Sequence, residues 1–185
     1  MIRRIQVMGP SGSGKSTLGL RLAEGLGVPH VELDAINWLP GWTERPREEF
    51  RAMLSEQTAE GWVVSGNYIS RGSDEILWPR ADLLVWLDLP LHVILPRQLT
   101  RSWHRWRTNE LLWGTNHERF FPQLKFWDRN SLVGFTLATR AASRARLVEA
   151  MRDPRWARAR WVRLTSQRAI DGFAASVLAE AGSAA

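Results

Sequence analysis

The sequence predicts an α/β protein built on a parallel five-stranded sheet with helices on both faces. Two observations support this class: short apolar runs alternate along the chain with longer segments of helical periodicity, and glycine or proline separates them. Strands that alternate with helices favour a parallel sheet, because each helix returns the chain to the same edge. A chain of 185 residues suits a single domain with a sizeable core.

The first strand and the first helix follow from the opening residues. Residues 2–8 predict a strand, since apolar residues alternate along it and Gly9 follows as a break. Residues 15–26 predict a helix, because leucines four residues apart fall on one face and Gly27 suits its end.

Further strands and helices alternate over the rest of the chain. Short apolar runs predict strands at residues 30–33, 62–65, 83–87 and 160–164. Helices are predicted at residues 44–60, 89–107 and 166–181. Prolines near the first turn support the first two of these helices, Pro96 predicts a kink in the second, and Ser166 can cap the third.

Composition indicates a soluble protein of the cytoplasm. The chain has no cysteine, which excludes disulfides and thiolate metal sites and fits a reducing compartment. The N-terminus has no signal-peptide pattern, and the longest apolar stretch, residues 83–96, contains Asp88 and His92 and is too short to span a bilayer. We therefore expect no membrane association.

The formal net charge of +6 is unevenly distributed. Residues 1–96 hold 9 basic and 12 acidic residues, whereas residues 97–185 hold 16 and 7. A basic half can indicate an anionic partner such as a nucleotide or a nucleic acid. Because 23 of the 25 basic residues are arginine, an arginine-rich composition explains the same excess equally well.

A phosphate-binding loop lies between the first strand and the first helix. Residues 9–16 read Gly-Pro-Ser-Gly-Ser-Gly-Lys-Ser and match the P-loop pattern G-x-x-x-x-G-K-[ST] at every fixed position. Glycines let successive N–H groups turn toward phosphate oxygens, and the helix N-terminus adds its dipole. We expect Lys15 to contact the β- and γ-phosphates of ATP and Ser16 to bind Mg²⁺. The expected nucleotide-binding residues are Gly9, Pro10, Ser11, Gly12, Ser13, Gly14, Lys15, Ser16, Thr17 and, over the base, Arg168.

The chain resembles the nucleoside-monophosphate-kinase branch of P-loop proteins, and within it the adenylate-kinase-like group often labelled topology modulation protein. The segments that carry the resemblance span most of the chain: GPSGSGKST, VELDAINWLPGW, PREEF, GWVVSGNY, RADLLVWLDLP and PRQLTR. The resemblance implies a P-loop NTPase three-layer fold with a lid-like helical insertion. No Asn-Lys-x-Asp segment is present, which disfavours a GTPase.

The resemblance also implies residues that place the phosphate acceptor. Asp34 is expected to orient the acceptor or the metal, with a helix N-cap as the alternative. Arg71 is expected to contact a phosphate of the acceptor, with a solvated loop charge as the alternative. Trp38 and Trp42 fit either an apolar wall for a base or ring, or hydrophobic plugs.

One position departs from the group. An acid usually precedes the Gly-Asn-Tyr sequence, where it holds Mg²⁺ waters, and this chain has Ser65 there. Either Asp34 or Asp88 takes over this role, or the metal is held more weakly. The resemblance favours a structural role for Asp88 at its strand end.

The last implied residues are lid arginines. Arg97 and Arg101 share one helix face, extended by Arg105, and are expected to compensate charge on the transferring phosphoryl group. The returning lid arginines are expected among Arg140, Arg144 and Arg146. We expect a single domain, 1–185, with an acceptor-binding-like segment at 35–61 and a lid-like insertion at 102–130. The aromatic residues of that insertion suit packing, dimerisation or stacking on nucleic acid.

These features predict an ATP- and Mg²⁺-dependent phosphotransferase acting on a small acceptor, with a nucleoside monophosphate as the expected one. A sugar or another hydroxyl compound is the alternative acceptor. From another class, a nucleotide-gated nucleic-acid-binding or regulatory protein also fits, and a homodimer is compatible with the chain's eleven tryptophans.

Overall fold

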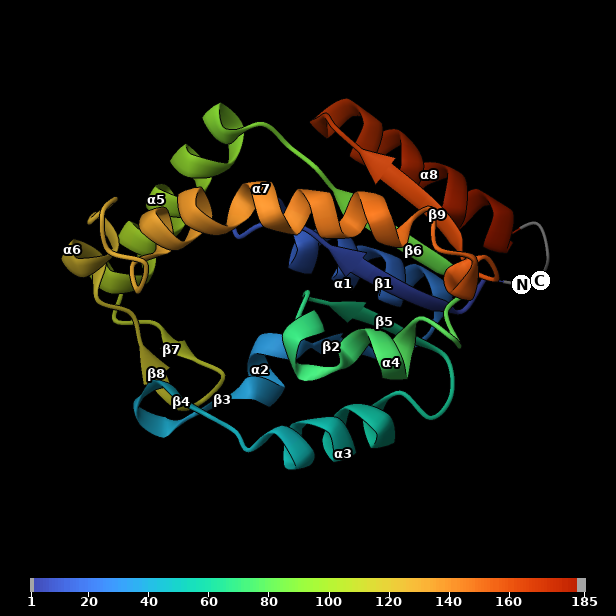
Figure 1. Cartoon of the computed structure of the whole chain (residues 1–185), viewed down its shortest axis with the longest axis horizontal. Helices are drawn as coiled ribbons and strands as arrows, with labels where there is room; N and C mark the ends of the chain where they lie inside the picture. Colours follow the sequence, from blue (N-terminus) through green and yellow to red (C-terminus); the bar gives the residue numbers. More distant parts are fainter. Residues whose placement is uncertain (1, 183–185) are drawn as a thin grey trace.

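The computed structural model of the chain describes residues 2–182 and has a five-stranded sheet at its centre (Figure 1). The strand order is β2-β5-β1-β6-β9, and every neighbouring pair is parallel. The strands are β1 (Arg4–Met8), β2 (His30–Glu32), β5 (Trp62–Ser65), β6 (Leu83–Leu87) and β9 (Arg160–Leu164). All five predicted strands are therefore present, and the last three have the predicted bounds.

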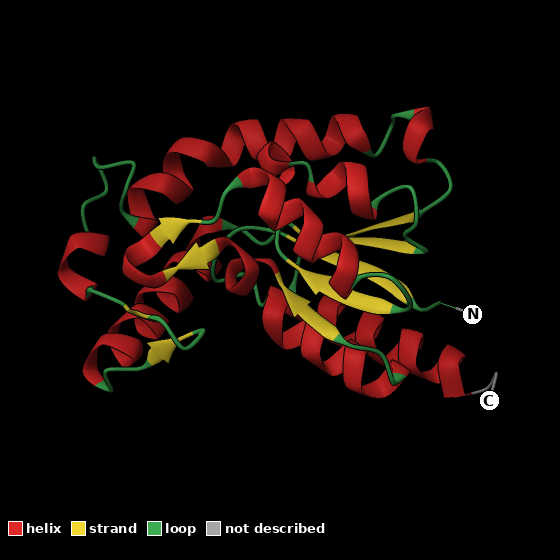
Figure 2. Ribbon diagram, turned by 90° about the horizontal axis from the view of Figure 1, so that it is seen from below, coloured by secondary structure: helices red, strands yellow, loops and turns green. Residues whose placement is uncertain are grey.

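Helices cover both faces of the sheet, as Figure 2 shows from a second direction. Apolar residues of α1, α5 and α8 pack on one face, and those of α3, α4 and α7 pack on the other. The helices are α1 (Lys15–Leu26), α2 (Leu33–Asn37), α3 (Arg47–Gln57), α4 (Ser73–Leu77), α5 (Leu91–Arg107), α6 (Phe120–Gln123), α7 (Leu132–Ala150) and α8 (Gln167–Gly182). The predicted α/β class, with a parallel sheet between two helical layers, is confirmed.

Some element bounds differ from the prediction. The helix expected from residue 44 begins at Arg47, because residues 43–44 instead pair with residues 38–39 as a hairpin. This hairpin consists of β3 (Trp38–Leu39), the 3₁₀ turn η1 (Pro40–Trp42) and β4 (Thr43–Glu44). Leu33, expected at a strand end, is the first residue of α2. Two further 3₁₀ turns are η2 (Ile69–Arg71) and η3 (Pro154–Trp156).

The long helices on the lid side also differ from the prediction. Helix α5 begins at Leu91, two residues after the predicted start, and continues through Pro96 to Arg107. The 19-residue α7 was not predicted as an element, because arginines interrupt its apolar positions. Ser131 caps its start by accepting a hydrogen bond from the N–H of Gly134.

Residues 102–130 comprise the last turns of α5 and most of the segment that leads to α7, and they extend beyond the main sheet (Figure 1). They contain the hairpin β7 (Leu111–Leu112) and β8 (Asn116–His117), followed by α6. Four rings pack together here, with centroids 5.1–6.3 Å apart: Trp103, Trp106, Phe120 and Phe121. Among residues 2–182, no helix has the length and apolar content needed to cross a membrane.

Candidate active site

The P-loop connects β1 to α1, and its shape depends on glycine. Gly9 and Gly12 have φ of 149° and 78°, in the region that L side chains rarely adopt. A Cβ on Gly9 would lie 2.7 Å from the Leu87 carbonyl oxygen, and one on Gly12 would lie 2.6 Å from the Ile94 carbonyl oxygen. The loop can therefore fit against β6 and α5 only with glycine at both positions. Gly14, with φ of 92°, is the N-cap of α1.

Lys15 is held at the mouth of this loop. Its Nζ donates a hydrogen bond to the Pro10 carbonyl oxygen at 3.0 Å. Burial, with a smaller contribution from Arg101, lowers the pKa of Lys15 to about 8, against the opposing effect of Asp34 and Glu32.

A cavity of about 290 Å³ lies on one side of the loop, between α1, α5 and α8. Its lining includes Gly12, Ser13, Gly14 and Thr17, which were expected to bind the nucleotide, and Arg97, which was expected as a lid arginine. The lining also contains Arg21, Gln167, Ile170 and Asp171, which the sequence interpretation did not include. The one sequence feature that could have indicated these residues is the polar first turn of the helix that follows the fifth strand. Arg168, expected to cover the base, is exposed and is not among the lining residues.

The two arginines of α5 that were expected as lid arginines lie on different sides of the loop. Arg97 donates a hydrogen bond to Gln167 at 3.1 Å and so belongs to the cavity beside α8. Arg101 donates one to the Ser11 hydroxyl at 2.6 Å and interacts electrostatically with Asp34 and Glu32. Arg101 therefore lies beside Ser11 of the P-loop, and Arg97 lies on the side of the loop that faces α8.

Asp34 faces the loop from α2. It lies within the first turn of that helix, whose N-cap is Glu32, so the capping alternative does not apply. The hydroxyl of Tyr68 donates a hydrogen bond to Asp34 Oδ1 at 2.7 Å. Burial and the Asp34 carboxylate raise the pKa of Tyr68, so the phenol stays protonated and keeps donating. Tyr68 reaches this position from a left-handed backbone conformation, with φ of 41°.

Tryptophans from two hairpins meet beside Asp34. The ring centroids of Trp38 and Trp42 are 5.6 Å apart, and those of Trp42 and Trp113 are 5.9 Å apart. Asn116 joins the hairpins, since its side chain accepts from the Trp42 N–H at 2.9 Å and donates to the Leu39 carbonyl at 2.9 Å. The β7–β8 hairpin of the insertion thus lies against the β3–β4 hairpin (Figure 1).

Arg71, expected to contact the acceptor's phosphate, is held by protein groups. Its guanidinium donates to Glu44 at 2.7 Å and to the Arg45 carbonyl, and it lies over the Phe50 ring at 5.3 Å. Only 14% of its side chain is exposed. The solvated-charge alternative does not describe it either, because these contacts fix α3 to η2.

Ser65 occupies the place where an acid was expected. It shares a hydrogen bond with His30 Nε2 at 2.9 Å and donates to the Lys15 carbonyl at 3.1 Å. A Cβ on Gly19 would clash with the Ser65 hydroxyl and would lie 2.7 Å from His30 Nε2. Burial lowers the pKa of His30, so the imidazole stays neutral at pH 7. These contacts fix the end of β5 to α1.

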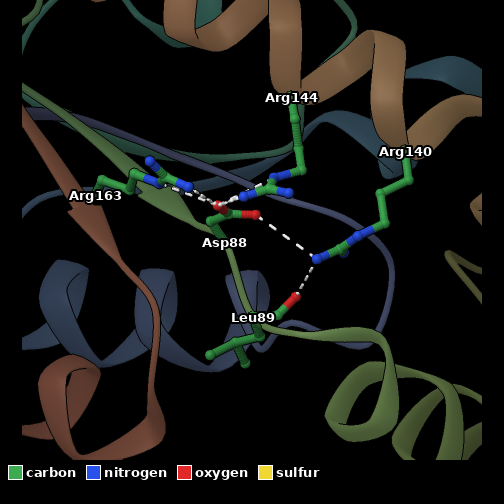
Figure 3. A network of polar contacts seen from close by, with 5 residues as sticks. All are labelled: Asp88, Leu89, Arg140, Arg144 and Arg163. Atoms are coloured by element: carbon green, nitrogen blue, oxygen red, sulfur yellow. Dashed lines mark hydrogen bonds and ion pairs between the residues drawn. The ribbon is translucent and has the colours of Figure 1, made fainter.

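Asp88 is surrounded by arginines at the end of β6 (Figure 3). Its side chain is 2% exposed and pairs with Arg144 at 3.0 Å and with Arg163 at 2.5 Å. Arg140 lies 3.8 Å from its other oxygen and donates to the Leu89 carbonyl. With these partners Asp88 links α7 and β9 to β6, the structural role that the resemblance favoured.

No family model matches the sequence. The uncharacterised protein YqaC of Bacillus subtilis is 29% identical over 144 residues, which cover 76% of this chain and 80% of that protein. The shikimate kinase of Acinetobacter baumannii, solved in complex with shikimate, is similar over 99% of this chain and 94% of its own, with a TM-score of 0.51 and 22% identity. The shikimate kinase of Bacteroides thetaiotaomicron is similar over 97% and 98%, with a TM-score of 0.54 and 21% identity. The chain therefore has the three-layer P-loop kinase fold.

Proposed function

We propose that the protein is an ATP- and Mg²⁺-dependent phosphotransferase that transfers the γ-phosphoryl group of ATP to a small acceptor. The observation that carries the proposal is the convergence on one loop of Lys15, Arg101 and Asp34, from three separate elements. Two cations and a carboxylate at a glycine-bounded phosphate site suit phosphoryl transfer, in which catalysis is mostly positioning and charge compensation.

The loop's N–H groups and the start of α1 would bind the phosphates of ATP. Lys15 would contact the β- and γ-phosphates, and Arg101 would compensate the charge of the transferring group. The nucleoside would occupy the cavity beside α8, next to Arg97 and Gln167. Arg97 then positions the nucleoside end, rather than the γ-phosphate.

Mg²⁺ would be held by the Ser16 hydroxyl together with the phosphates. Ser16 is exposed at the first turn of α1, and its oxygen is the hard donor that Mg²⁺ prefers. Among residues 2–182, no group of three or more His, Cys, Asp or Glu side chains forms a metal site. When bound, the ion supplies charge neutralisation at the phosphates.

Asp34 would orient the acceptor. One of its carboxylate oxygens accepts from Tyr68, which leaves the other free for an acceptor hydroxyl. The hydroxyl oxygen forms a bond to the γ-phosphorus, the bond to the β,γ-bridging oxygen breaks, and ADP leaves with that electron pair. The hydroxyl proton passes to the Asp34 carboxylate.

Residues 102–130 would act as the lid over an acceptor segment at 35–61, within a single domain of residues 1–185. Asn116 and His117 hold the β7–β8 hairpin against Trp42, which encloses the side of the loop that faces Asp34. Exclusion of water there would protect ATP from hydrolysis.

Binding of Mg·ATP and acceptor-dependent formation of ADP test the proposal. Lys15→Ala should weaken Mg·ATP binding by about tenfold to a hundredfold, the usual range for a lost charge-assisted contact. Lys125→Ala removes the chain's other lysine and should leave the affinity unchanged. The absence of measurable heat with Mg·ATP, or equal affinities in the two variants, would contradict the proposal. Tight, salt-sensitive binding of DNA without turnover would favour the nucleic-acid-binding alternative.

A further inference from the structure

Seven side chains beside the P-loop are linked by contacts and by electrostatic interactions, and we call them the acceptor ring. Beginning at Lys15, the contacts run through an electrostatic interaction with Asp34 and through hydrogen bonds that join Asp34 to Tyr68 and Tyr68 to Trp38. They continue through the edge-to-face tryptophans to Trp113, whose Nε1 donates to Glu32 at 3.3 Å. Glu32 interacts electrostatically with Lys15 and closes the ring. Its members are Lys15, Glu32, Asp34, Trp38, Trp42, Tyr68 and Trp113.

The two carboxylates of the acceptor ring would repel the phosphate of a phosphorylated acceptor. The cation of the ring, Lys15, and the adjacent Arg101 both face the P-loop, where the phosphates of ATP would engage them. Once they are engaged, the carboxylates of Glu32 and Asp34 remain on the acceptor side. A phosphate or carboxylate on the acceptor would face two like charges, which disfavours binding strongly.

The arginines near the acceptor ring have other partners. Arg71 is held by Glu44 and by the Arg45 carbonyl, and Arg45 itself donates to the Ile36 carbonyl. Arg51 pairs with Glu75 at 2.8 Å. Within residues 30–75, which the structure describes throughout, Arg47 alone has no such partner, and it is exposed in the first turn of α3. The Nε of Arg71 has no hydrogen-bond partner but is buried, so an anionic acceptor would have to displace Glu44 to reach this guanidinium group.

We propose, on the basis of the proposed phosphotransferase function, that the acceptor is a hydroxyl compound that carries no phosphate or carboxylate. Its hydroxyl would donate to the free oxygen of Asp34, and its apolar face or an ammonium group would lie against the tryptophans. Neutral rings and protonated amines both bind well to tryptophan faces bordered by carboxylates. The acceptor is therefore a neutral or amine-bearing polyhydroxy compound, not a nucleoside monophosphate.

Acceptor pairs that differ only in the anionic group provide the test. Adenosine is compared with AMP, cytidine with CMP, and glucose with glucose 6-phosphate, and glucosamine separates an amine-bearing acceptor from a neutral one. ADP formation gives kcat/KM for each compound, and calorimetry with Mg²⁺ and a non-hydrolysable ATP analogue gives its affinity. We expect the uncharged or amine-bearing member to be preferred by at least about tenfold, as like-charge contacts imply.

Charge-neutral variants test the electrostatic cause. Glu32→Gln removes one negative charge, and its amide oxygen can still accept the hydrogen bond from Trp113. The ratio of kcat/KM for the uncharged member to that for the anionic member should therefore fall at least about threefold. Glu24→Gln, which replaces an exposed acid in the last turn of α1, is the matched control and should leave the preference between the two members unchanged. Arg71→Gln and Arg47→Gln should change kcat/KM for the two members of a pair by factors that agree within about twofold. A selective loss of monophosphate use in either variant would restore the monophosphate interpretation.

The outcomes separate the two proposals. Equal or better use of the anionic members, or an unchanged preference in Glu32→Gln, overturns the acceptor assignment. The same holds if Mg·ATP binds normally and no compound of the panel binds or turns over. If Mg·ATP itself does not bind, the phosphotransferase proposal fails instead.

Discussion

Replacement of Asp88 by Asn should destabilise the fold, because it removes the carboxylate that joins three elements. The Asp88 side chain is 2% exposed and receives donors from α7 and β9. At an effective dielectric constant of about 20, two opposite unit charges about 4 Å apart attract each other by about 4 kcal/mol before desolvation is counted. The substituted side chain would keep one acceptor oxygen but turn an NH₂ group toward guanidinium groups.

The expected loss is smaller than the sum of these attractions. Removal of one partner of a fully buried ion pair costs about 3–5 kcal/mol. Here Arg144 and Arg163 keep 47% and 37% of their side-chain surface, so water replaces part of what is lost. We expect a decrease of about 2–3 kcal/mol in the free energy of unfolding, which for a chain of this length lowers Tm by about 5–10 °C.

Urea denaturation of the variant and a double-mutant cycle with Arg144→Met measure this effect. The cycle should give a coupling energy of at least about 1 kcal/mol, because both changes remove the same contact. Glu49→Gln breaks an exposed pair with Arg45 at 3.6 Å and should cost less than about 0.5 kcal/mol. A stability within about 0.5 kcal/mol of wild type, or additive effects of Asp88→Asn and Arg144→Met, would refute the reasoning.

Two further predictions concern pH. Lys15 has a pKa of about 8 and would bind phosphate as the ammonium ion, so the Kd for Mg·ATP should rise by up to about tenfold per pH unit above pH 8. Calorimetry between pH 7.5 and 9.5 measures this change. In Lys15→Arg the Kd should depend less on pH over the same range. The folded-state pKa of His30 lies below its usual value of 6.5, so protonation favours the unfolded state and the free energy of unfolding should fall as pH drops below about 6.5. His30→Gln, whose amide can replace Nε2, should reduce that slope in urea titrations at pH 7.5 and 5.5, and an unchanged slope would contradict the assignment.

The central strands were predictable because they are buried on both faces. Strands β5, β6 and β9 have the predicted bounds, and β5 and β6 are almost fully enclosed, which forces continuous apolar runs in the sequence. Helix α1 has its predicted bounds as well, since leucines mark its core face and Gly27 marks its end. Helix α7 was missed because arginines at positions 140 and 144 point to Asp88 from a helix whose apolar face is narrow.

Only the part of the candidate site that consists of backbone groups, the P-loop, was predictable from the sequence. The P-loop residues follow from a fixed glycine spacing, whereas the surroundings of Arg71 depend on Glu44, 27 positions away. Likewise, the pairing of Trp113 with Glu32 joins residues 81 positions apart. Such pairs leave no periodic signal, because each is set by how the two hairpins meet in the fold.

The contact among Gly19, His30 and Ser65 constrains how this site can change by mutation. A side chain at position 19 has no room beside the Ser65 hydroxyl, and an acid at position 65 would set a carboxylate against the Lys15 carbonyl. The ring nitrogen of His30 is the remaining partner, and it would have to donate its hydrogen to that carboxylate. The three positions, on α1, β2 and β5, are thus locked together, and an acidic metal-binding residue cannot be restored there by one substitution without cost to its neighbours.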